Sequence, residues 1–429
     1  MHTTFKTISV IGLGYIGLPT AAVLANRGVQ VIGVDVNEKA VETINRGEIH
    51  IVEPELDVMV RGAVTAGRLR AVTVPEPAEA FIIAVPTPLD QNHAPDLSYI
   101  EKAASSIAPV LKKGDLVILE STSPVGTTEK LALWLSGARP DLTFPHQSEI
   151  VADIQMAYCP ERVLPGHILR EITDNDRIIG GMTARCAART EELYKVFVRG
   201  KCIVTNTRTA EMTKLTENAF RDVNIAFANE LSIICDSLKI DVWELIELAN
   251  LHPRVKIFQP GPGVGGHCIA VDPWFIVDSA PEAARLIATA REVNNSKPDY
   301  VIAKIMEKAQ RFKSPVIACL GLAFKADIDD LRESPALQIV KKLTRQELCT
   351  LLVVEPNISA LPEELVIFPH LKLVDLHEAI LNADIVVLLV NHREFYQLNE
   401  RELIEKIVID TRGVWKHPKS EIAATGGLL

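Results

Sequence analysis

Cys268 lies in the most unusual stretch of the chain, Pro260-Gly-Pro-Gly-Val-Gly-Gly-His-Cys268-Ile-Ala-Val-Asp272-Pro. A cysteine that only fills a core normally lies among apolar residues of a strand or helix. Cys268 instead follows four glycines, whose backbone can approach a ligand closely. A helix that begins just after it would favour the nucleophilic thiolate. The pattern predicts a reactive cysteine, and an incidental cysteine in a strained loop is the alternative.

The remaining cysteines lack such a setting. They are scattered and form no C-x-x-C pair, so we expect no metal cluster and no disulfide framework. We expect most of them to be buried apolar fillers in a reducing compartment: Cys159, Cys186, Cys202, Cys235, Cys319 and Cys349.

A glycine-rich loop near the N-terminus predicts a dinucleotide site. Gly12-Leu-Gly14-Tyr-Ile-Gly17 follows an apolar run and opens a helical pattern. Glycines at these positions allow a tight turn, close approach to a pyrophosphate and close helix–strand packing. Asp35 ends the next apolar run, where a carboxylate binds ribose hydroxyls and repels a 2′-phosphate. The loop therefore predicts NAD rather than NADP, with a structural turn as the alternative. The expected contacts are Gly12, Gly14, Tyr15, Ile16, Gly17 and Asp35.

Two threonines follow further expected strands. Thr87 lies in Pro86-Thr87-Pro88, and Thr122 lies in Ser121-Thr122-Ser123. Open α/β sheets bind ligands at the carboxyl ends of their strands, so both threonines are candidates to touch the cofactor. A turn residue is the alternative at either position.

A nicotinamide site beside a nucleophilic cysteine implies a particular chemistry. An alcohol that loses one hydride becomes an aldehyde, which has no tetrahedral carbon to donate a second. Addition of a thiolate restores such a carbon as a thiohemiacetal, and a second hydride transfer gives a thioester that water cleaves. The two motifs together predict oxidation of an alcohol to a carboxylate.

The secondary-structure elements that must position these residues are predicted to form an α/β fold. With 429 residues, the chain predicts two or three domains. Continuous Val/Ile runs predict parallel strands covered on both faces. We expect two Rossmann-like doubly wound domains joined by a long central helix over 208–238. Their expected extents are 1–205, 206–300 and 301–429. Strands are expected over 6–11, 31–35, 81–85, 116–120, 316–320, 351–355, 384–390 and 407–410, and further helices over 15–28, 241–250 and 281–310.

The charge excludes some partners. A formal net charge of −10 gives no general attraction for nucleic acid or an anionic membrane. The apolar runs are shorter than the roughly 20 residues of a membrane span, and residues 5–11 leave no room for a signal peptide. We expect a cytoplasmic protein.

Several motifs together resemble the UDP-glucose/GDP-mannose dehydrogenase family, over nearly the whole chain. They are Glu120-Ser-Thr-Ser-Pro-Val-Gly-Thr, Cys159-Pro-Glu-Arg-Val-Leu-Pro-Gly, Lys214-Leu-Thr-Glu-Asn218-Ala-Phe-Arg221 and Phe324-Lys-Ala-Asp-Ile-Asp-Asp-Leu-Arg332-Glu-Ser-Pro. The resemblance implies that Cys268 is the nucleophile and that Lys214 and Asn218 stabilise the oxyanion. It implies that Asp272, with Thr122, positions the hydrolytic water, and Glu161 is the other candidate base. Without it, a solvated helix face would be the preferred interpretation of Lys214 and Arg221.

The same resemblance implies the substrate and its contacts. Arg162, Val163, Lys214, Asn218, Arg221, His252, Arg254 and Gly265 match positions that line the sugar and diphosphate, and Lys325, Arg332 and Arg412 match positions that hold the UDP end. Guanidinium groups suit phosphate because they donate two parallel bonds. The equivalent of Arg254 comes from a neighbouring subunit in the family, which implies a homodimer.

Finer motifs favour an N-acetylated amino sugar. Relatives that act on UDP-glucose typically carry lysine at the position of Val271. Within the family, His252-Pro-Arg254-Val and Gly-Gly-His-Cys-Ile-Ala-Val-Asp-Pro-Trp resemble the motifs of relatives that act on UDP-N-acetyl-D-mannosamine. This resemblance implies oxidation of that sugar at C6 to the mannosaminuronate. UDP-N-acetylglucosamine is the nearest alternative substrate. A two-electron hydroxyacid-type NAD dehydrogenase and a non-catalytic nucleotide-sensing protein are the further alternatives. The mannosaminuronate would serve bacterial surface polysaccharides such as enterobacterial common antigen.

Overall fold

The fold is taken from a computed structural model, which describes residues 5–148, 151–164, 166–346 and 349–415. The chain forms two compact units. The first comprises 1–217 and 274–281, and the second 218–273 and 282–429. Among the described residues, no helix combines the length and apolarity needed to cross a membrane.

An eight-stranded sheet forms the centre of the first unit, in the order β3-β2-β1-β4-β5-β6-β7-β8. The first six strands of this order pair in parallel, β7 is antiparallel to β6, and β8 is parallel to β7. This is the strand order of a dinucleotide-binding fold, extended at one edge. The strands are β1 (Thr7–Ile11), β2 (Gln30–Val34), β3 (Leu69–Val72), β4 (Ala80–Ile83), β5 (Leu116–Leu119), β6 (Gln155–Tyr158), β7 (Arg177–Gly181) and β8 (Cys202–Asn206).

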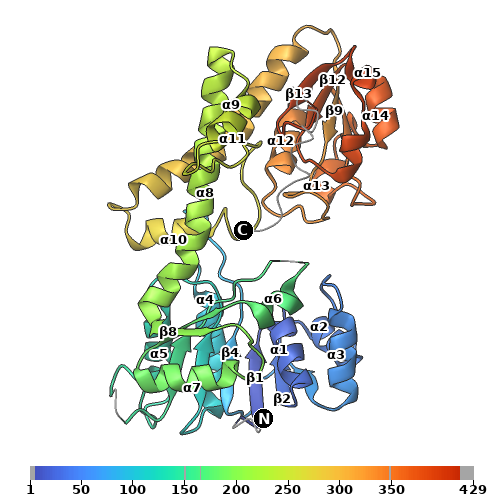
Figure 1. The fold of residues 1–429 in the computed structure, drawn as a ribbon. Coiled ribbons are helices and arrows are strands. Elements are labelled where there is room, and N and C mark those ends of the chain that lie inside the picture. The colour runs from blue at the N-terminus through green and yellow to red at the C-terminus, as the bar shows by residue number, and fades with distance from the viewer. Residues whose placement is uncertain (1–4, 149–150, 165, 347–348, 416–429) are drawn as a thin grey trace. The chain divides into compact units, whose positions relative to one another are not determined.

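Helices cover both faces of this sheet and form two apolar cores (Figure 1). One core is formed with α1 (Gly17–Asn26), α2 (Glu38–Asn45), α3 (Leu56–Thr65), α6 (Ile168–Asp174) and α7 (Ala184–Tyr194). The other is formed with α4 (Ser98–Ile107), the short 3-10 helix Ala108–Val110 and α5 (Thr127–Ala138). Both faces of the inner strands are therefore buried, which explains their continuous apolar runs.

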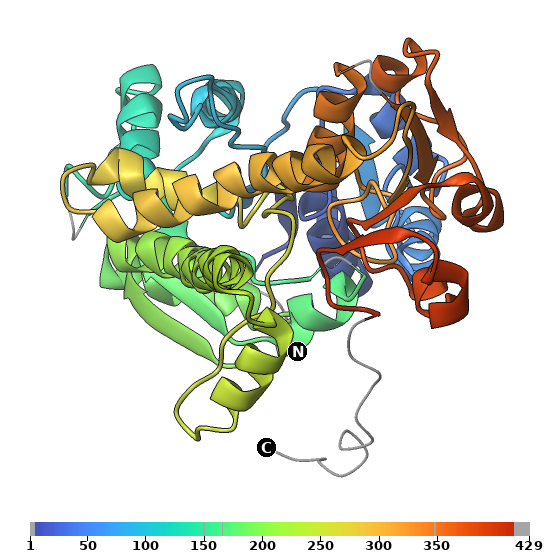
Figure 2. The ribbon, with the colours of Figure 1, turned by 90° about the horizontal axis from the view of Figure 1, so that it is seen from above.

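The middle of the chain is helical. α8 (Thr207–Leu238) runs unbroken for 32 residues, as expected from a stretch without proline or glycine. It is followed by α9 (Val242–Asn250), α10 (Asp272–Ser279) and α11 (Arg285–Ala309). α11 crosses α8 (Figures 1 and 2). The expected helix over 281–310 begins later, at Arg285.

The second unit holds a five-stranded parallel sheet in the order β11-β10-β9-β12-β13. Its strands are β9 (Val316–Leu320), β10 (Thr350–Val354), β11 (Leu371–Leu373), β12 (Ile385–Leu388) and β13 (Ile407–Asp410). α11, α12 (Pro335–Thr344) and α13 (Glu363–Val366) contribute to the core on one face. α14 (Leu376–Asn382), the 3-10 helix Arg393–Gln397 and α15 (Glu400–Leu403) contribute to the other. The predicted fold class, two Rossmann-like units and a long central helix, is confirmed.

Candidate active site

The glycine loop between β1 and α1 has the geometry of a dinucleotide site. Gly12 has φ +88°, and a Cβ there would lie 2.7 Å from the Ala84 carbonyl oxygen. A Cβ on Gly17 would lie 1.8 Å from the Gly12 oxygen, so only glycine allows α1 to start this close to the strand. A Cβ on Gly14 would meet nothing within 4 Å. Gly14 thus leaves open space at a helix start, where a pyrophosphate is stabilised by the helix dipole. The loop fits NAD.

Asp35 directly follows β2 and holds this loop. The Leu13 N–H donates to Asp35 Oδ2 over 2.8 Å, and the Asn37 N–H donates to Oδ1 over 2.9 Å. A carboxylate has about four acceptor positions, so two bonds leave capacity for two ribose hydroxyls. The carboxylate is therefore placed and oriented by backbone groups before any ligand binds.

The two threonine loops lie at the same edge of the sheet. The Thr87 hydroxyl is buried and has no hydrogen-bond partner among the described residues, as expected of a group that awaits a ligand. Thr122 is half-buried between Ser121 and Ser123. The Ser121 hydroxyl donates to the Val85 carbonyl over 2.7 Å and so ties the loop after β5 to the loop after β4.

Lys214 and Glu161 form a buried ion pair. Lys214 Nζ lies 3.1 Å from Glu161 Oε1, and their side chains are 8% and 12% exposed. The Val163 N–H donates to Glu161 Oε2 over 2.8 Å and orients the carboxylate. Lys214 therefore does not lie on a solvated helix face, and the structure brings together two of the predicted catalytic residues.

The start of α8 is anchored by a residue that was not predicted. Glu211 is buried and accepts bonds from the Gly126 N–H (2.6 Å), the Thr128 N–H (2.8 Å) and the Thr128 hydroxyl (2.6 Å). Its carboxylate thereby binds the N-terminal turn of α5, where negative charge is stabilising. This fixes the turn of α8 that carries Lys214 against the segment that follows Thr122.

A buried cluster of charged and polar side chains contacts the loop after β6. Arg177 Nη1 donates to the Pro160 carbonyl over 3.1 Å and lies 3.4 Å from Glu120 Oε1, which also accepts from the Tyr194 hydroxyl over 3.3 Å. Burial raises the pKa of Glu120 to about 7, against the attraction of Arg177. Pro160 directly precedes Glu161, so the cluster holds the predicted base in place.

Arg162, from the same loop, pairs with α8. Arg162 Nη2 lies 2.7 Å from Glu217 Oε1, and both side chains remain about one-third exposed. Part of the charge that we expect to face the substrate is thus neutralised by a neighbouring carboxylate.

In the second unit, Cys268 is the exposed cysteine of the seven, all of which are described. Cys159, Cys186, Cys235, Cys319 and Cys349 are buried and Cys202 is intermediate. The Asp272 N–H donates to the Cys268 carbonyl over 2.9 Å, and α10 begins at Asp272. The expectation of a helix just after the cysteine is confirmed.

Asn218 and Asp272 meet directly. Asn218 Nδ2 donates to Asp272 Oδ2 over 2.5 Å, and Asp272 is 3% exposed. Lys214 and Asn218 lie four residues apart on α8, which places them on one face of the helix.

The glycines before Cys268 allow close packing on the loop that follows β9. A Cβ on Gly265 would lie 2.4 Å from the Glu333 carbonyl oxygen, and Gly266 has φ +82° with Phe324 nearby. His267, which was not predicted, lies 3.5 Å from Arg332, whose guanidinium is bound to Asp330 at 2.6 Å. Burial, and then the charge of Arg332, lower the pKa of His267, so this ring is neutral at pH 7.

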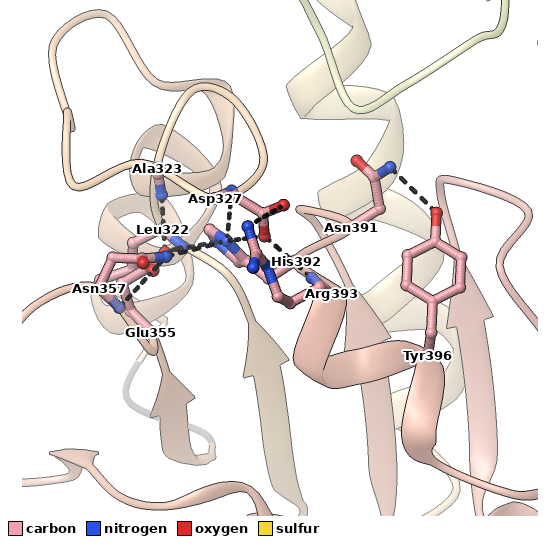
Figure 3. A network of polar contacts seen from close by, with 9 residues as sticks. All are labelled: Leu322, Ala323, Asp327, Glu355, Asn357, Asn391, His392, Arg393 and Tyr396. Atoms are coloured by element: carbon pink, nitrogen blue, oxygen red, sulfur yellow. Dashed lines mark hydrogen bonds and ion pairs between the residues drawn. The ribbon is translucent and has the colours of Figure 1, made fainter. Parts of the chain in front are cut away.

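His392 fixes the loop over 322–327, which includes Lys325. Figure 3 shows its contacts with Asp327 and Glu355. His392 is fully buried, and its Nε2 lies 3.0 Å from Glu355 Oε2. Its Nδ1 accepts the Asp327 N–H over 2.9 Å. Although burial opposes it, the bonds from His392 and the Leu322 and Ala323 N–H groups lower the pKa of Glu355 to about 2. Lys325 itself is exposed.

Three side chains near this loop are of types that bind metal ions. They are Asp327, His392 and Glu394, whose potential ligand atoms lie within 4.8 Å of one another. His392 Nδ1 is already an acceptor for the Asp327 N–H, and its other nitrogen faces Glu355. Both ring nitrogens of His392 are therefore used to hold the loop, and we assign no metal ion to these residues.

Arg412 follows β13. Arg412 Nε donates to the Leu389 carbonyl over 3.1 Å, and Nη1 would lie 2.8 Å from a Cβ on Gly261. Burial lowers the pKa of Arg412 to about 10, so it stays charged at pH 7. Arg221, His252 and Arg254 are exposed, and their substrate contacts stay predictions.

Comparison with known proteins identifies the family of the chain. The profiles of one family match residues 6–198 as its NAD binding domain, 208–296 as its central domain and 318–417 as its UDP binding domain. The chain belongs to the UDP-glucose/GDP-mannose dehydrogenase family. The resemblance found in the motifs is confirmed, the protein is an NAD-dependent dehydrogenase, and NAD is its cofactor.

Relatives cover nearly the full length. The chain is 66% identical to an NDP-N-acetyl-D-galactosaminuronic acid dehydrogenase from Ralstonia nicotianae, over 96% of both chains. It is 60% identical to the UDP-N-acetyl-D-mannosamine dehydrogenase of Escherichia coli, over 96% of this chain and all of the relative. Among solved structures, a UDP-D-ManNAc dehydrogenase from Pyrococcus horikoshii matches with a TM-score of 0.84 and 39% identity, over 97% of both chains.

Proposed function

We propose that the protein oxidises UDP-N-acetyl-D-mannosamine at C6 to the mannosaminuronate, by a four-electron reaction through Cys268. The observation that carries the proposal is the exposed Cys268, in a glycine-rich turn before α10, in a chain whose other cysteines are buried or half-buried. A dehydrogenase that removed only two electrons would have no need of this thiol. The 60% identity to a relative named for this sugar supports the substrate.

The loop of Gly12, Gly14 and Gly17, with Tyr15 and Ile16, would hold the cofactor pyrophosphate, and Asp35 the adenosine ribose. Thr87 and Thr122 would contact the same cofactor at the strand ends. These residues would hold NAD, which would supply the hydride acceptor, one NAD molecule for each of the two oxidations.

Lys214 and Asn218 act on the oxygen at C6 in this scheme. The ammonium of Lys214, held by Glu161 at 3.1 Å, stabilises the alkoxide and later the oxyanion of the adduct. Asn218, whose amide is oriented by Asp272, donates a second bond to the same oxygen. Both groups are held by a neighbouring carboxylate, so they need little reorganisation during the reaction.

Cys268 makes the second oxidation possible. Its sulfur adds to the C6 aldehyde, which forms a C–S bond and, after protonation of the oxygen, a thiohemiacetal. Loss of the second hydride gives a thioester, and water then cleaves the C–S bond to return the thiol. One alcohol and one water thus give one carboxylate, two hydrides and three protons. Asp272 with Thr122, or alternatively Glu161, would take the proton of the hydrolytic water.

We assign the substrate contacts to the predicted cationic and polar residues, which are Arg162, Val163, Arg221, His252, Arg254 and Gly265 for the sugar and diphosphate and Lys325, Arg332 and Arg412 for the UDP end. A homodimer in which Arg254 completes the neighbouring site is part of the proposal. Phe220, Phe227 and Ile234 support it, because they are exposed on α8 at spacings of seven residues, a pattern typical of helix pairing. The proposal also keeps the three domains with boundaries at 205 and 300. It further includes a cytoplasmic location and a role in surface polysaccharides such as enterobacterial common antigen.

A second sugar has support of its own. The Ralstonia relative, at 66% identity, is named for N-acetyl-D-galactosaminuronic acid, a stereoisomer that the sequence motifs did not suggest. UDP-N-acetyl-D-galactosamine is therefore the second candidate substrate, ahead of UDP-N-acetylglucosamine.

The test is a substrate panel with NADH counted against sugar consumed. Purified protein is supplied with NAD and, in turn, the UDP derivatives of N-acetylmannosamine, N-acetylgalactosamine, N-acetylglucosamine and glucose. We expect the highest kcat/KM for the first sugar and two NADH per uronate formed. A preference for the galactosamine sugar would replace the proposed substrate and leave the proposed chemistry unchanged. One NADH per sugar would refute the four-electron reaction and favour the hydroxyacid type.

A further inference from the structure

A row of buried polar residues joins α8 to α11, outside the residues to which the proposed mechanism assigns a role. Its members are Asp222, Asn229, Arg291, Asn294 and Lys297, each no more than 5% exposed. Figure 2 shows α11 crossing α8, the two helices that contribute these side chains. Buried polar groups of this number need a complete set of partners, so their bonds define one arrangement.

The first part of the row has a fixed direction. Asn294 Nδ2 donates to the Asp222 carboxylate over 2.8 Å and to the Asp222 carbonyl over 3.1 Å. Arg291 Nη1 donates to the same carboxylate oxygen over 2.6 Å. A carboxylate and a carbonyl only accept hydrogen bonds, so Asn294 must turn its NH₂ group toward Asp222. Its amide oxygen is therefore directed at Asn229.

The same logic fixes the next amide. Asn229 Nδ2 donates to Asn294 Oδ1 over 2.8 Å, which leaves the Asn229 oxygen on the other side. That oxygen accepts the Gly261 N–H over 2.8 Å, and this bond is buried. Lys297 supports Asn229 from α11, with Nζ 3.4 Å from the Asn229 carbonyl and a bond to Ser232. The ion pair at Asp222 thereby determines which atom Asn229 presents to Gly261.

Gly261 opens the segment that ends at Cys268. Arg412 lies against Gly261, where a Cβ would be 2.8 Å from Nη1. Two residues further, Gly263 has φ +145° and would place a Cβ 2.9 Å from Pro335 and 3.3 Å from Pro298 of α11. The segment therefore runs through a close-fitting passage, and the hydrogen bond from Gly261 to Asn229 fixes where it enters.

We propose that Asn229 is a positioning residue for the Cys268 loop. Its amide oxygen, directed by Asn294 and Asp222, holds the Gly261 backbone and so sets the path of the loop and the seat of Arg412. The inference rests on the proposed function, because the position of the Cys268 loop matters for catalysis only if Cys268 is the nucleophile. Asn229 acts through Gly261 and is not itself a catalytic residue.

Two substitutions of similar volume separate this role from general stabilisation. Asn229→Leu removes the acceptor for Gly261 and also the donor to Asn294. Asn229→Asp removes the donor, keeps an oxygen for Gly261 and adds a carboxylate charge on the residue whose carbonyl lies 3.4 Å from Lys297 Nζ. Asn45→Leu is the matched control, because Asn45 makes the same kind of clasp on Ala71 (2.8 and 2.9 Å) in the first unit. Each variant is made in the full chain and compared by its Tm.

The readout is the rate at which iodoacetamide alkylates Cys268, with Cys268→Ser as the background from the six other cysteines. Loss of one buried hydrogen bond with an unsatisfied partner corresponds to about a tenfold effect. We expect Asn229→Leu to slow alkylation and lower kcat by about tenfold, with the KM for NAD unchanged. Asn229→Asp and Asn45→Leu should stay within about threefold of the unchanged chain. If both Asn229 variants slow equally, or if Asn229→Leu has no effect, the proposal is wrong.

Should Asn229→Leu not accumulate as folded protein, Asn294→Leu replaces it. That change leaves Asn229 in place but frees its amide to rotate, so alkylation should slow by about threefold or more, and an unchanged rate would overturn the proposal. Alkylation needs no sugar. A chain that oxidises none of the UDP-sugars would refute the proposed function, while the ranking of the variants would still decide the role of Asn229.

Discussion

The buried pair of Lys214 and Glu161 gives the most informative perturbation. Lys214→Met keeps the length of the side chain and removes its charge. Glu161 then remains about 12% exposed, with the Val163 N–H but without its cation. Removal of one partner of a buried ion pair costs about 3–5 kcal/mol, because the other charge stays buried. For a unit of this size, we expect Tm to fall by about 6–20 °C. Loss of an oxyanion-stabilising group should also lower kcat by about 10²–10³.

The double variant Lys214→Met/Glu161→Gln separates the two effects. It removes both charges, so we expect calorimetry to show that most of the lost Tm returns. The ammonium is still missing, so kcat measured by NADH absorbance should stay at least about a hundredfold below that of the unchanged chain. Tryptophan fluorescence titrations with NAD serve as a control for the cofactor site.

Two results would refute the reasoning. If the double variant recovered both Tm and kcat, Lys214 would only neutralise Glu161. If Lys214→Met lost no stability, Glu161 would not be left as a buried unpaired charge, and the ion pair would not be shielded from solvent.

Further predictions concern the cofactor, the UDP end and the pH dependence of stability. Asp35→Ala should relax discrimination against NADP by about tenfold or more in kcat/KM, and an unchanged ratio would contradict the ribose contact. His392→Gln should raise the KM for the UDP-sugar by about tenfold with kcat within about threefold, because the Asp327 N–H loses its acceptor and the Lys325 loop is no longer held; a loss confined to kcat would contradict this. Because burial raises the pKa of Glu120 from 4.5 to about 7, the folded chain binds a proton that the unfolded chain has released. The resulting stability is complete below about pH 4.5 and is lost as the pH rises through about 7, by on the order of 1–3 kcal/mol. Glu120→Gln should flatten this part of the Tm–pH curve, and an unchanged slope would assign it to other groups.

Elements with a strong local pattern could be predicted from sequence. The helix expected over 208–238 differs from α8 by one residue, because its periodicity is uninterrupted. Strands β9 and β13 agree residue for residue with the ranges 316–320 and 407–410. Strands β3, β6, β7, β8 and β11 were not predicted. β8 is largely exposed at the edge of the sheet, so it lacks the apolar run that marks a buried strand.

Pairings across long sequence separations could not be predicted. The environment of Lys214 depends on Glu161, 53 residues earlier in the chain, and no local pattern announces that contact. His267 was visible in the Gly-Gly-His-Cys motif but received no role, since its neighbour Arg332 is distant in sequence. By contrast, the glycine-rich sequence before Cys268 distinguished it from the other cysteines, and it is the exposed one of the seven.

The most direct test of the central claim is to trap the adduct on Cys268. Protein, NAD and UDP-N-acetyl-D-mannosamine are mixed, quenched in acid within milliseconds and digested, and the Cys268 peptide is weighed by mass spectrometry. We expect the mass of the thioester-linked UDP-sugar on Cys268, which hydroxylamine removes. Cys268→Ser should give either an ester that is hydrolysed slowly, with uronate formed far more slowly, or no adduct and no uronate. Uronate formation at the normal rate by Cys268→Ser would contradict the account.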